Sequence, residues 1–153
     1  MLAEDRGPSF LPHVTLVGGI PCQSEEEALQ LGKALQDGLR GFGEVPCHFS
    51  LTPKTSEGVW NQALYLTMDE TDPFMKLCET CRVILGLPLP CNFAPPALKP
   101  HMSLFYGVKD VPNASEVEPV KSFQASTIAM WTTSPSTLAS VPNWKEIAVI
   151  QLE

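Results

Sequence analysis

The stretch Pro12–Leu16, which reads Pro-His-Val-Thr-Leu, returns later in the chain as Pro100–Leu104, which reads Pro-His-Met-Ser-Leu. Each copy is a proline, a histidine, an apolar residue, a small hydroxyl residue and a leucine. The chain contains 3 histidines, and only His48 lies outside this pattern, so we expect His48 to be structural. The repeated pattern is the strongest indication of both fold and function.

Each copy has the side-chain period of a β-strand. In an extended chain, alternate side chains point to opposite faces, so His13 and Thr15 share one face and the apolar residues share the other. The second copy places His101 beside Ser103 in the same way. If the two strands are neighbours, two imidazoles and two hydroxyls converge on one small volume, which suits a phosphate. A single histidine on a strand is more often structural than catalytic, but two copies favour a shared site.

Imidazole chemistry near neutral pH suggests a reaction for such a volume. One neutral histidine can take a proton from an attacking water, while a second, protonated, histidine gives one to the leaving oxygen. The hydroxyls of Thr15 and Ser103 can donate hydrogen bonds to the phosphoryl oxygens. This arrangement requires no metal and no cofactor. A cyclic phosphodiester is the natural substrate, because its sugar alkoxide leaves readily only when it is protonated as the bond breaks.

The paired His-x-[Ser/Thr] strands resemble those of the two-histidine phosphoesterase superfamily. The surrounding residues resemble its plant and yeast cyclic phosphodiesterase branch, as seen in Phe10–Thr15, Pro100–Tyr106 and the C-terminal Trp144–Val149. The similarity runs from about Phe10 to the end of the chain. It implies hydrolysis of ADP-ribose 1″,2″-cyclic phosphate to ADP-ribose 1″-phosphate, a late step in handling the by-product of tRNA splicing. It also implies hydrolysis of nucleoside 2′,3′-cyclic phosphates to 2′-phosphates.

The resemblance also assigns roles to residues. His13 and His101 are the expected catalytic acid and base, in an order that the sequence leaves open, and Thr15 and Ser103 are the expected phosphate-binding residues. Tyr106 lies where the family places a tyrosine at its site. Strict strand alternation would send Tyr106 to the opposite face, so it reaches the site only if the strand ends or bulges near the following glycine.

The expected fold is α+β, with residues 1–153 forming a single domain of two lobes. Each lobe is an antiparallel sheet with helices outside, and rough two-fold pseudosymmetry relates the lobes. The resembled enzymes begin with a strand and a helix ahead of the first motif, whereas this chain begins about a dozen residues before His13. We therefore expect an N-terminally truncated first lobe, with an open edge or exposed apolar surface.

Periodicity predicts the other elements. Helices are expected after Ser24, ending near Gly41 or Gly43, and from Asp72 to about Leu85, with Ser24 and Asp72 as N-caps. The remaining expectations are strands over residues 45–51, 59–67, 123–132 and 144–152, the first two paired as a hairpin and the last buried on both sides, a short helix near residues 113–116 and an irregular loop over 86–100.

The cysteines give a weak signal. Cys78 and Cys81 form a single Cys-x-x-Cys, which is weak evidence for zinc without a fourth ligand nearby, so no metal site is predicted. Buried thiols are the expected state. The resembled family includes members with disulfides, and Cys81 with Cys91 is the pair to test for one.

Composition limits the partners. The net charge is −7 and the pI is about 4.9, which argues against a broad electrostatic surface for polymeric nucleic acid. We expect a monomer that binds a small cyclic nucleotide and no membrane. The first residues have no apolar core of signal-peptide length, and no later run reaches the roughly 18 apolar residues of a membrane span, so a cytoplasmic location is predicted.

Three alternatives remain open from the sequence. A 2′-5′ RNA ligase or RNA cyclic phosphodiesterase of the same superfamily would keep the four motif residues, but it should present a basic groove. A non-catalytic nucleotide-binding module would bind the product and turn nothing over. In a purely structural protein, replacing either motif histidine would alter stability alone.

Overall fold

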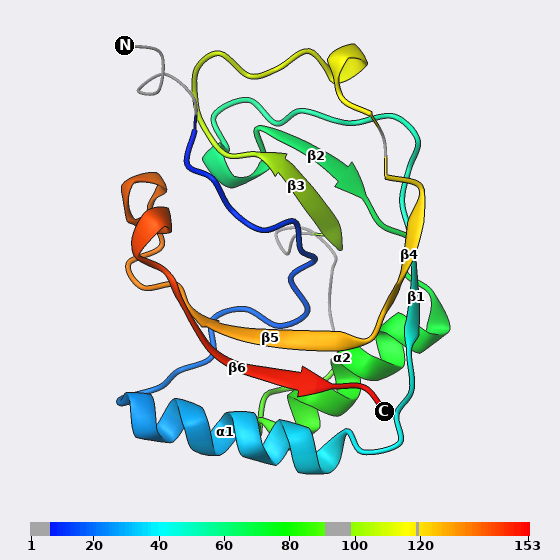
Figure 1. Cartoon of the computed structure of the whole chain (residues 1–153), viewed down its shortest axis with the longest axis vertical. Coiled ribbons are helices and arrows are strands. Elements are labelled where there is room, and N and C mark those ends of the chain that lie inside the picture. The colour runs from blue at the N-terminus through cyan, green and yellow to red at the C-terminus, as the bar shows by residue number, and fades with distance from the viewer. Residues whose placement is uncertain (1–6, 91–98, 119) are drawn as a thin grey trace.

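The computed structural model describes residues 7–90, 99–118 and 120–153, which form a mixed α+β fold (Figure 1). The α+β class expected from the sequence is therefore confirmed. In chain order, the elements of these residues are α1 (Glu25–Gly38), β1 (Val45–His48), the 3₁₀ helix η1 (Trp60–Gln62), β2 (Leu64–Thr67), α2 (Asp72–Ile84), β3 (His101–Phe105), η2 (Ala114–Glu116), β4 (Ser122–Ala125), β5 (Thr127–Thr132), η3 (Leu138–Asn143) and β6 (Lys145–Gln151).

The strands form three antiparallel pairs, β1 with β4, β2 with β3, and β5 with β6. In Figure 1, β2 and β3 lie toward one end of the molecule and β5 and β6 toward the other, with β1 and β4 along the side that joins them. Helix α1 packs against β6, and α2 contacts both α1 and β1. The last two expected strands are present, although the first of them is divided at Ser126 into β4 and β5.

The expected hairpin between residues 45–51 and 59–67 was wrong. β1 pairs with β4, and β2 pairs with β3, so the two segments meet only through an isolated bridge between Phe49 and Met68. The turn residues between the two segments predict that the chain reverses, but they do not determine which strand pairs with β1. The partner strand is determined by burial over long range, here of Val45 and Cys47 in the core.

The first motif does not form the expected strand. Among residues 7–20, only Val14 makes a β-bridge, and its partner is Met102 of β3. Pro12 precedes this bridge and supplies no backbone N–H, while Gly18 and Gly19 end the extended stretch soon after it. The segment is therefore held beside β3 at one point rather than along a ladder.

Helix α1 begins as its sequence predicts. The Ser24 side chain caps it by accepting a hydrogen bond from the backbone N–H of Glu27 at 3.1 Å, and three glutamates occupy the first turn, where the helix dipole favours negative charge. The helix ends at Gly38, earlier than expected. A Cβ at Gly32 would lie 3.1 Å from the Cβ of Ala148, so this glycine lets α1 pack closely on β6.

Helix α2 also lies where it was predicted, with a small correction at its start. Thr71 occupies the N-cap position, and Asp72, the expected cap, is the first helical residue. Pro73 follows in the first turn, where its missing N–H costs nothing. The buried face consists of Phe74, Leu77, Cys78 and Cys81. The short helix predicted near residues 113–116 is η2, capped by Asn113.

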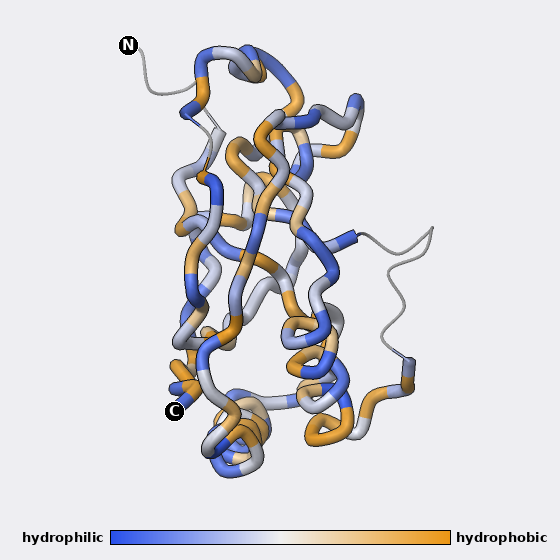
Figure 2. The backbone as a smooth tube through the Cα atoms, turned by 90° about the vertical axis from the view of Figure 1, so that its right-hand side faces the viewer, coloured by the Kyte–Doolittle hydropathy of each residue, from blue (hydrophilic) through white to orange (hydrophobic). Residues whose placement is uncertain are grey.

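A single apolar cluster unites the elements. Its most deeply buried side chains are Leu39, Val45, Leu66, Ile150 and Leu152. The tube in Figure 2 shows hydrophobic and hydrophilic positions interleaved along the chain, as one-sided burial requires. The expectation that β6 is buried on both sides was wrong, because Ile150 is 1% exposed and the adjacent Val149 is 46% exposed. Helix α1 packs on one face of β6, and among the described residues no helix or strand covers Val149 on the other face.

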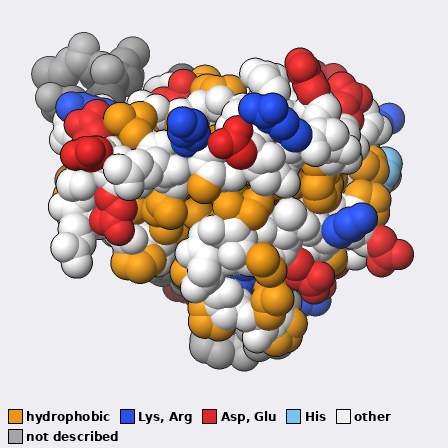
Figure 3. Space-filling model, turned by 90° about the horizontal axis from the view of Figure 1, so that it is seen from below, with side chains coloured by type: hydrophobic (Ala, Val, Ile, Leu, Met, Phe, Trp, Pro, Cys, Tyr) orange, Lys and Arg blue, Asp and Glu red, His pale blue; other side chains and the backbone are white. Residues whose placement is uncertain are grey.

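Apolar side chains also reach the surface. On the underside of the molecule they gather in the middle of the face, with charged side chains around them (Figure 3). Leu29 on α1 and Val83 on α2 are exposed, as is Trp131 on β5. Single exposed apolar residues are ordinary at protein surfaces, so the exposure expected of a truncated first lobe stays a prediction. No helix in the described part of the chain has the length and apolar character needed to cross a membrane.

The cysteine pairing suggested by the resemblance was wrong. Cys81 is a free, buried thiol whose pKa is raised by burial to about 11, while Cys78 is in a disulfide. Both residues lie on the buried face of α2, so helical spacing alone does not distinguish them. Cys91, and with it much of the expected loop over residues 86–100, lies outside the described residues. Within the described ranges, no cluster of three or more potential metal ligands occurs.

Candidate active site

The two motif copies meet at their central apolar residues. The bridge between Val14 and Met102 is antiparallel, so in this register His13 falls opposite Ser103 and Thr15 falls opposite His101. Directly opposite residues of an antiparallel pair point to the same face. Alternation about this bridge predicts that the four polar side chains share one face, while Met102, 3% exposed, points into the core.

Both histidines make the same bond to the main chain. Nδ1 of His13 lies 2.6 Å from the carbonyl oxygen of Leu11, and Nδ1 of His101 lies 2.8 Å from that of Lys99. In each copy the acceptor is two residues before the histidine. Because a carbonyl oxygen can only accept, each Nδ1 carries a hydrogen and donates it. Nε2 is therefore the nitrogen on which each ring can gain or lose a proton.

His101 occupies a well-packed position on β3. The strand pairs with β2, and the Tyr65 ring of β2 meets the His101 ring edge-on, with centroids 5.7 Å apart. Nε2 of the Gln62 side chain lies 3.3 Å from Nδ1 and 3.2 Å from Nε2 of His101. Burial lowers the pKa of His101, the bond to the Lys99 carbonyl opposes this effect, and the charge of nearby His13 adds to it.

His13 has a different environment. It is exposed, as is Thr15, and both belong to the segment that is bridged to β3 only at Val14. The Phe10 ring lies edge-on to the His13 ring, with centroids 6.2 Å apart. The charge of His13 contributes to the lowered pKa of His101. One motif histidine is therefore half-buried and the other is exposed.

Ser103, one of the two expected phosphate-binding residues, is buried. It is 5% exposed, and its hydroxyl donates a hydrogen bond of 2.6 Å to the backbone carbonyl of Asn61. The proton of Ser103 is therefore already committed to the protein, whereas no such bond is found for the hydroxyl of Thr15.

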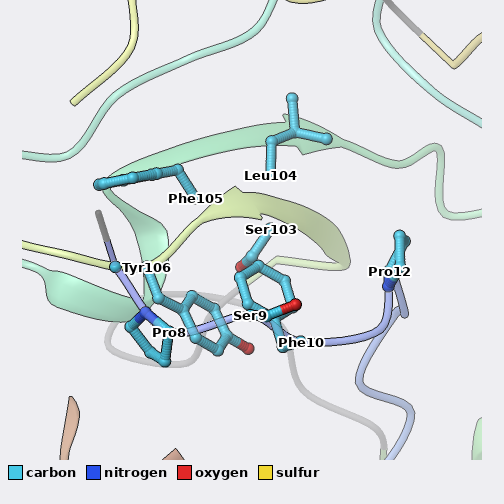
Figure 4. Close-up of a pocket in the computed structure, with 9 residues that line it drawn as sticks. Pro8, Ser9, Phe10, Pro12, Ser103, Leu104, Phe105 and Tyr106 are labelled. Atoms are coloured by element: carbon cyan, nitrogen blue, oxygen red, sulfur yellow. The ribbon is translucent and has the colours of Figure 1, made fainter. Parts of the chain in front are cut away.

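Tyr106 meets the condition that the sequence set for it. The pairing of β3 with β2 shifts between Leu64, opposite Phe105, and Tyr65, opposite Ser103, so Leu104 is left as a bulge. The strand then ends at Phe105. Tyr106 lies beside Ser103 at a shared cavity, and the two rings of Phe10 and Tyr106 lie together there (Figure 4). Burial raises the pKa of Tyr106.

The cavity lies between the first motif segment and the end of β3. Its volume is about 320 Å³, and its walls are Gly7, Pro8, Ser9, Phe10, Pro12, Ser103, Leu104, Phe105 and Tyr106. Aromatic rings dominate this region. Phe10 stacks on Tyr106 with centroids 3.8 Å apart, and Trp60 and Trp144 meet Tyr106 edge-on at 5.3 and 6.4 Å. Such an aromatic surface is suited to the flat, apolar part of a ligand, and Ser103 is the motif residue that lines it.

The helix η1 supplies the contacts that the sequence analysis missed. The backbone carbonyl of Trp60 accepts a hydrogen bond from Gly107, that of Asn61 accepts from Ser103, and Gln62 contacts His101. We had assigned this stretch to a strand. The adjacent polar pair Asn61-Gln62, followed by the adjacent apolar pair Ala63-Leu64, breaks the alternation of a strand and was the available signal.

Comparison with protein-family models gives no match, and no curated protein matches the chain either. Assignment to the two-histidine phosphoesterases is therefore a proposal, which rests on the paired motifs and on their geometry.

Proposed function

We propose that this chain is a cyclic phosphodiesterase of the two-histidine type. The observation that carries the proposal is the antiparallel bridge between Val14 and Met102, from which we infer that two histidines and two hydroxyl residues lie on one face. The identical Nδ1 bonds support it further, since they leave Nε2 of both rings as the proton-exchanging atom. In this proposal the two copies belong to two lobes related by approximate two-fold pseudosymmetry.

The environments of the histidines suggest their roles. Because burial and the neighbouring charge of His13 lower the pKa of His101, His101 is the neutral base near pH 7. Its Nε2 takes a proton from water as the water oxygen bonds to phosphorus. His13, which is exposed, is then the acid, and it gives its Nε2 proton to the sugar oxygen as the phosphorus–oxygen bond breaks. Proton exchange with solvent then restores both rings.

Hydroxyl groups hold the phosphoryl oxygens in this mechanism. Thr15 is exposed on the site face and can donate directly. Ser103 must turn its hydroxyl from the Asn61 carbonyl to the phosphate. The exchange is favourable, because a hydrogen bond to a charged oxygen is stronger than one to a neutral carbonyl. Tyr106, beside Ser103 at the cavity, adds a further hydroxyl.

The substrates proposed are ADP-ribose 1″,2″-cyclic phosphate, giving ADP-ribose 1″-phosphate, and nucleoside 2′,3′-cyclic phosphates, giving 2′-phosphates. The aromatic cavity beside Ser103 supports a nucleoside substrate. The net charge of −7 argues against the RNA-ligase alternative, which needs a basic groove. A cytoplasmic location belongs to the same proposal.

A non-catalytic nucleotide-binding module is the second candidate. It is favoured by the state of Ser103, whose proton is donated to Asn61 rather than presented at the site. Such a module would bind cyclic phosphate or product through the same face without turnover.

The test is hydrolysis of a nucleoside 2′,3′-cyclic phosphate in excess EDTA, with the 2′- and 3′-phosphate products resolved. We expect formation of the 2′-phosphate, and we expect the exposed-histidine control His48→Ala to retain the rate. Binding of the cyclic phosphate without turnover would support the module instead. Neither binding nor turnover would contradict both candidates.

A further inference from the structure

Gln62 contacts the proposed base directly and has no role in the mechanism above. It is the last residue of η1 and is 7% exposed, so its amide is held inside the protein. The amide nitrogen lies 3.3 Å from Nδ1 and 3.2 Å from Nε2 of His101. A buried amide so close to both nitrogens of one imidazole needs an explanation.

The two distances locate the amide relative to the ring. The in-plane directions of Nδ1 and Nε2 diverge, and any in-plane position this close to both nitrogens would overlap the carbon between them. The Gln62 nitrogen therefore lies over the face of the His101 ring. Nδ1 is bonded to the Lys99 carbonyl, so Nε2 is the ring nitrogen left to take a proton.

The amide also affects the charge of the ring. An N–H group presents its positive end, which is attracted to the electron-rich face of a neutral ring and repelled by an imidazolium. The titratable groups facing His101 are His13, from the first motif segment, and Tyr65, from β2. Gln62 is thus a neutral donor that acts in the same direction as the charge of His13.

We propose that Gln62 is a positioning residue that holds the His101 ring with Nε2 directed at the attacking water and keeps that ring neutral. The inference rests on the proposed role of His101 as the base. Gln62 acts on the face of the ring, Lys99 fixes its Nδ1 edge, and Tyr65 packs edge-on against it. The side chain needed here is an uncharged donor of this length. A carboxylate in its place would stabilise the protonated His101 ring, which cannot act as the base.

The test compares Gln62→Glu, which preserves shape and adds a negative charge, with Gln62→Met, which removes the donor. Gln30→Met is the matched control, because Gln30 is an exposed glutamine on α1. The titration of His101 is followed by NMR through its ring protons, with thermal melts to verify folding. We expect Gln62→Glu to raise the midpoint by roughly one pH unit or more, and Gln62→Met to raise it by less. The control should leave it unchanged.

Turnover supplies the second readout. The acidic limb of the pH–rate profile should move with the NMR midpoint, so that Gln62→Glu loses rate at neutral pH and recovers it at higher pH. An unchanged His101 midpoint in folded Gln62→Glu and Gln62→Met would overturn the inference. If the wild-type chain binds cyclic phosphate but does not hydrolyse it, the proposed function fails, while the NMR titration still decides whether Gln62 controls the proton of His101.

Discussion

The two motif copies share a sequence pattern but not an environment. The first lies on an exposed segment with a single bridge to the fold, and its histidine and threonine are open to solvent. The second lies on a five-residue strand that pairs with β2, with Ser103 buried and His101 half-buried. Both histidines nevertheless make the same bond to a carbonyl two residues back. The local sequence thus sets the tautomer, and tertiary packing sets the proton affinity.

The largest expected effect comes from replacing either motif histidine, and we expect it to be similar for the two copies. His13→Ala and His101→Ala should each lower turnover by at least roughly 10²-fold, because each removes one of the two proton-transfer groups. Initial rates with a 2′,3′-cyclic phosphate measure this, and circular dichroism establishes that the variants are folded. A variant that kept near wild-type turnover would show that its histidine is not part of the acid–base pair.

The next prediction compares how much the central apolar residue of each copy contributes to stability. Met102→Ala should lower the free energy of unfolding by about 2–5 kcal/mol, because it opens a cavity in the core. Val14→Ala should cost less, since Val14 is only partly buried. Urea denaturation of the two variants tests this order. Equal losses would mean that the first copy is anchored as firmly as the second.

The hydroxyl residues give a third contrast. Ser103→Ala leaves the Asn61 carbonyl without its donor and should cost about 1–3 kcal/mol of stability. Thr15→Val, at an exposed position, should change stability by no more than about 0.5 kcal/mol. Both should slow turnover if both hydroxyls bind phosphoryl oxygens. Unfolding curves and rates measured on the same preparations distinguish the two effects, and a stable Ser103→Ala would argue against the Asn61 bond in solution.

The smallest expected effect concerns pH. The pKa of His101 in the folded protein is below its ordinary value of 6.5, so the unfolded chain binds more protons in the window just below that value. The free energy of unfolding should therefore decrease as the pH falls through this window. In His101→Asn this contribution should be absent. Urea denaturation at pH 7 and pH 5 tests the difference, and identical pH dependence in both proteins would contradict it.

Much of the candidate site was predictable because it depends on local rules. In the second copy, which is a strand, alternation predicted that Ser103 lies on the same side as His101 and that Met102 is buried. In the first copy, which is not a strand, the placement of His13 beside Thr15 stays a prediction. Helix α1 followed from Ser24 and the glutamates after it. For Tyr106, alternation alone did not predict on which face of the strand the side chain lies. That depends on a bulge, which is set by the pairing with β2.

Other features depend on contacts distant in the sequence. The pairing of β1 with β4 joins segments more than seventy residues apart, as with Val45 and Ala125, and no turn signal marks it. The role of Gln62 depends on η1 replacing the start of an expected strand. The exposure of Val149 reflects the absence of a covering layer over one face of β6 among the described residues, which periodicity alone does not reveal.

The hydrogen bond from Nδ1 to the main chain means that each motif sets the tautomer of its own histidine. Leu11 and Lys99, which supply the two carbonyls, have nothing in common as side chains, so the acceptor is independent of residue type. Each precedes a proline, which disfavours the helical conformation for the residue before it and keeps the chain extended. A segment of four or five residues therefore contains its own tautomer control. Grafted onto the edge of an unrelated sheet, it should present a histidine with the same nitrogen outward, leaving the host to provide only the proton affinity.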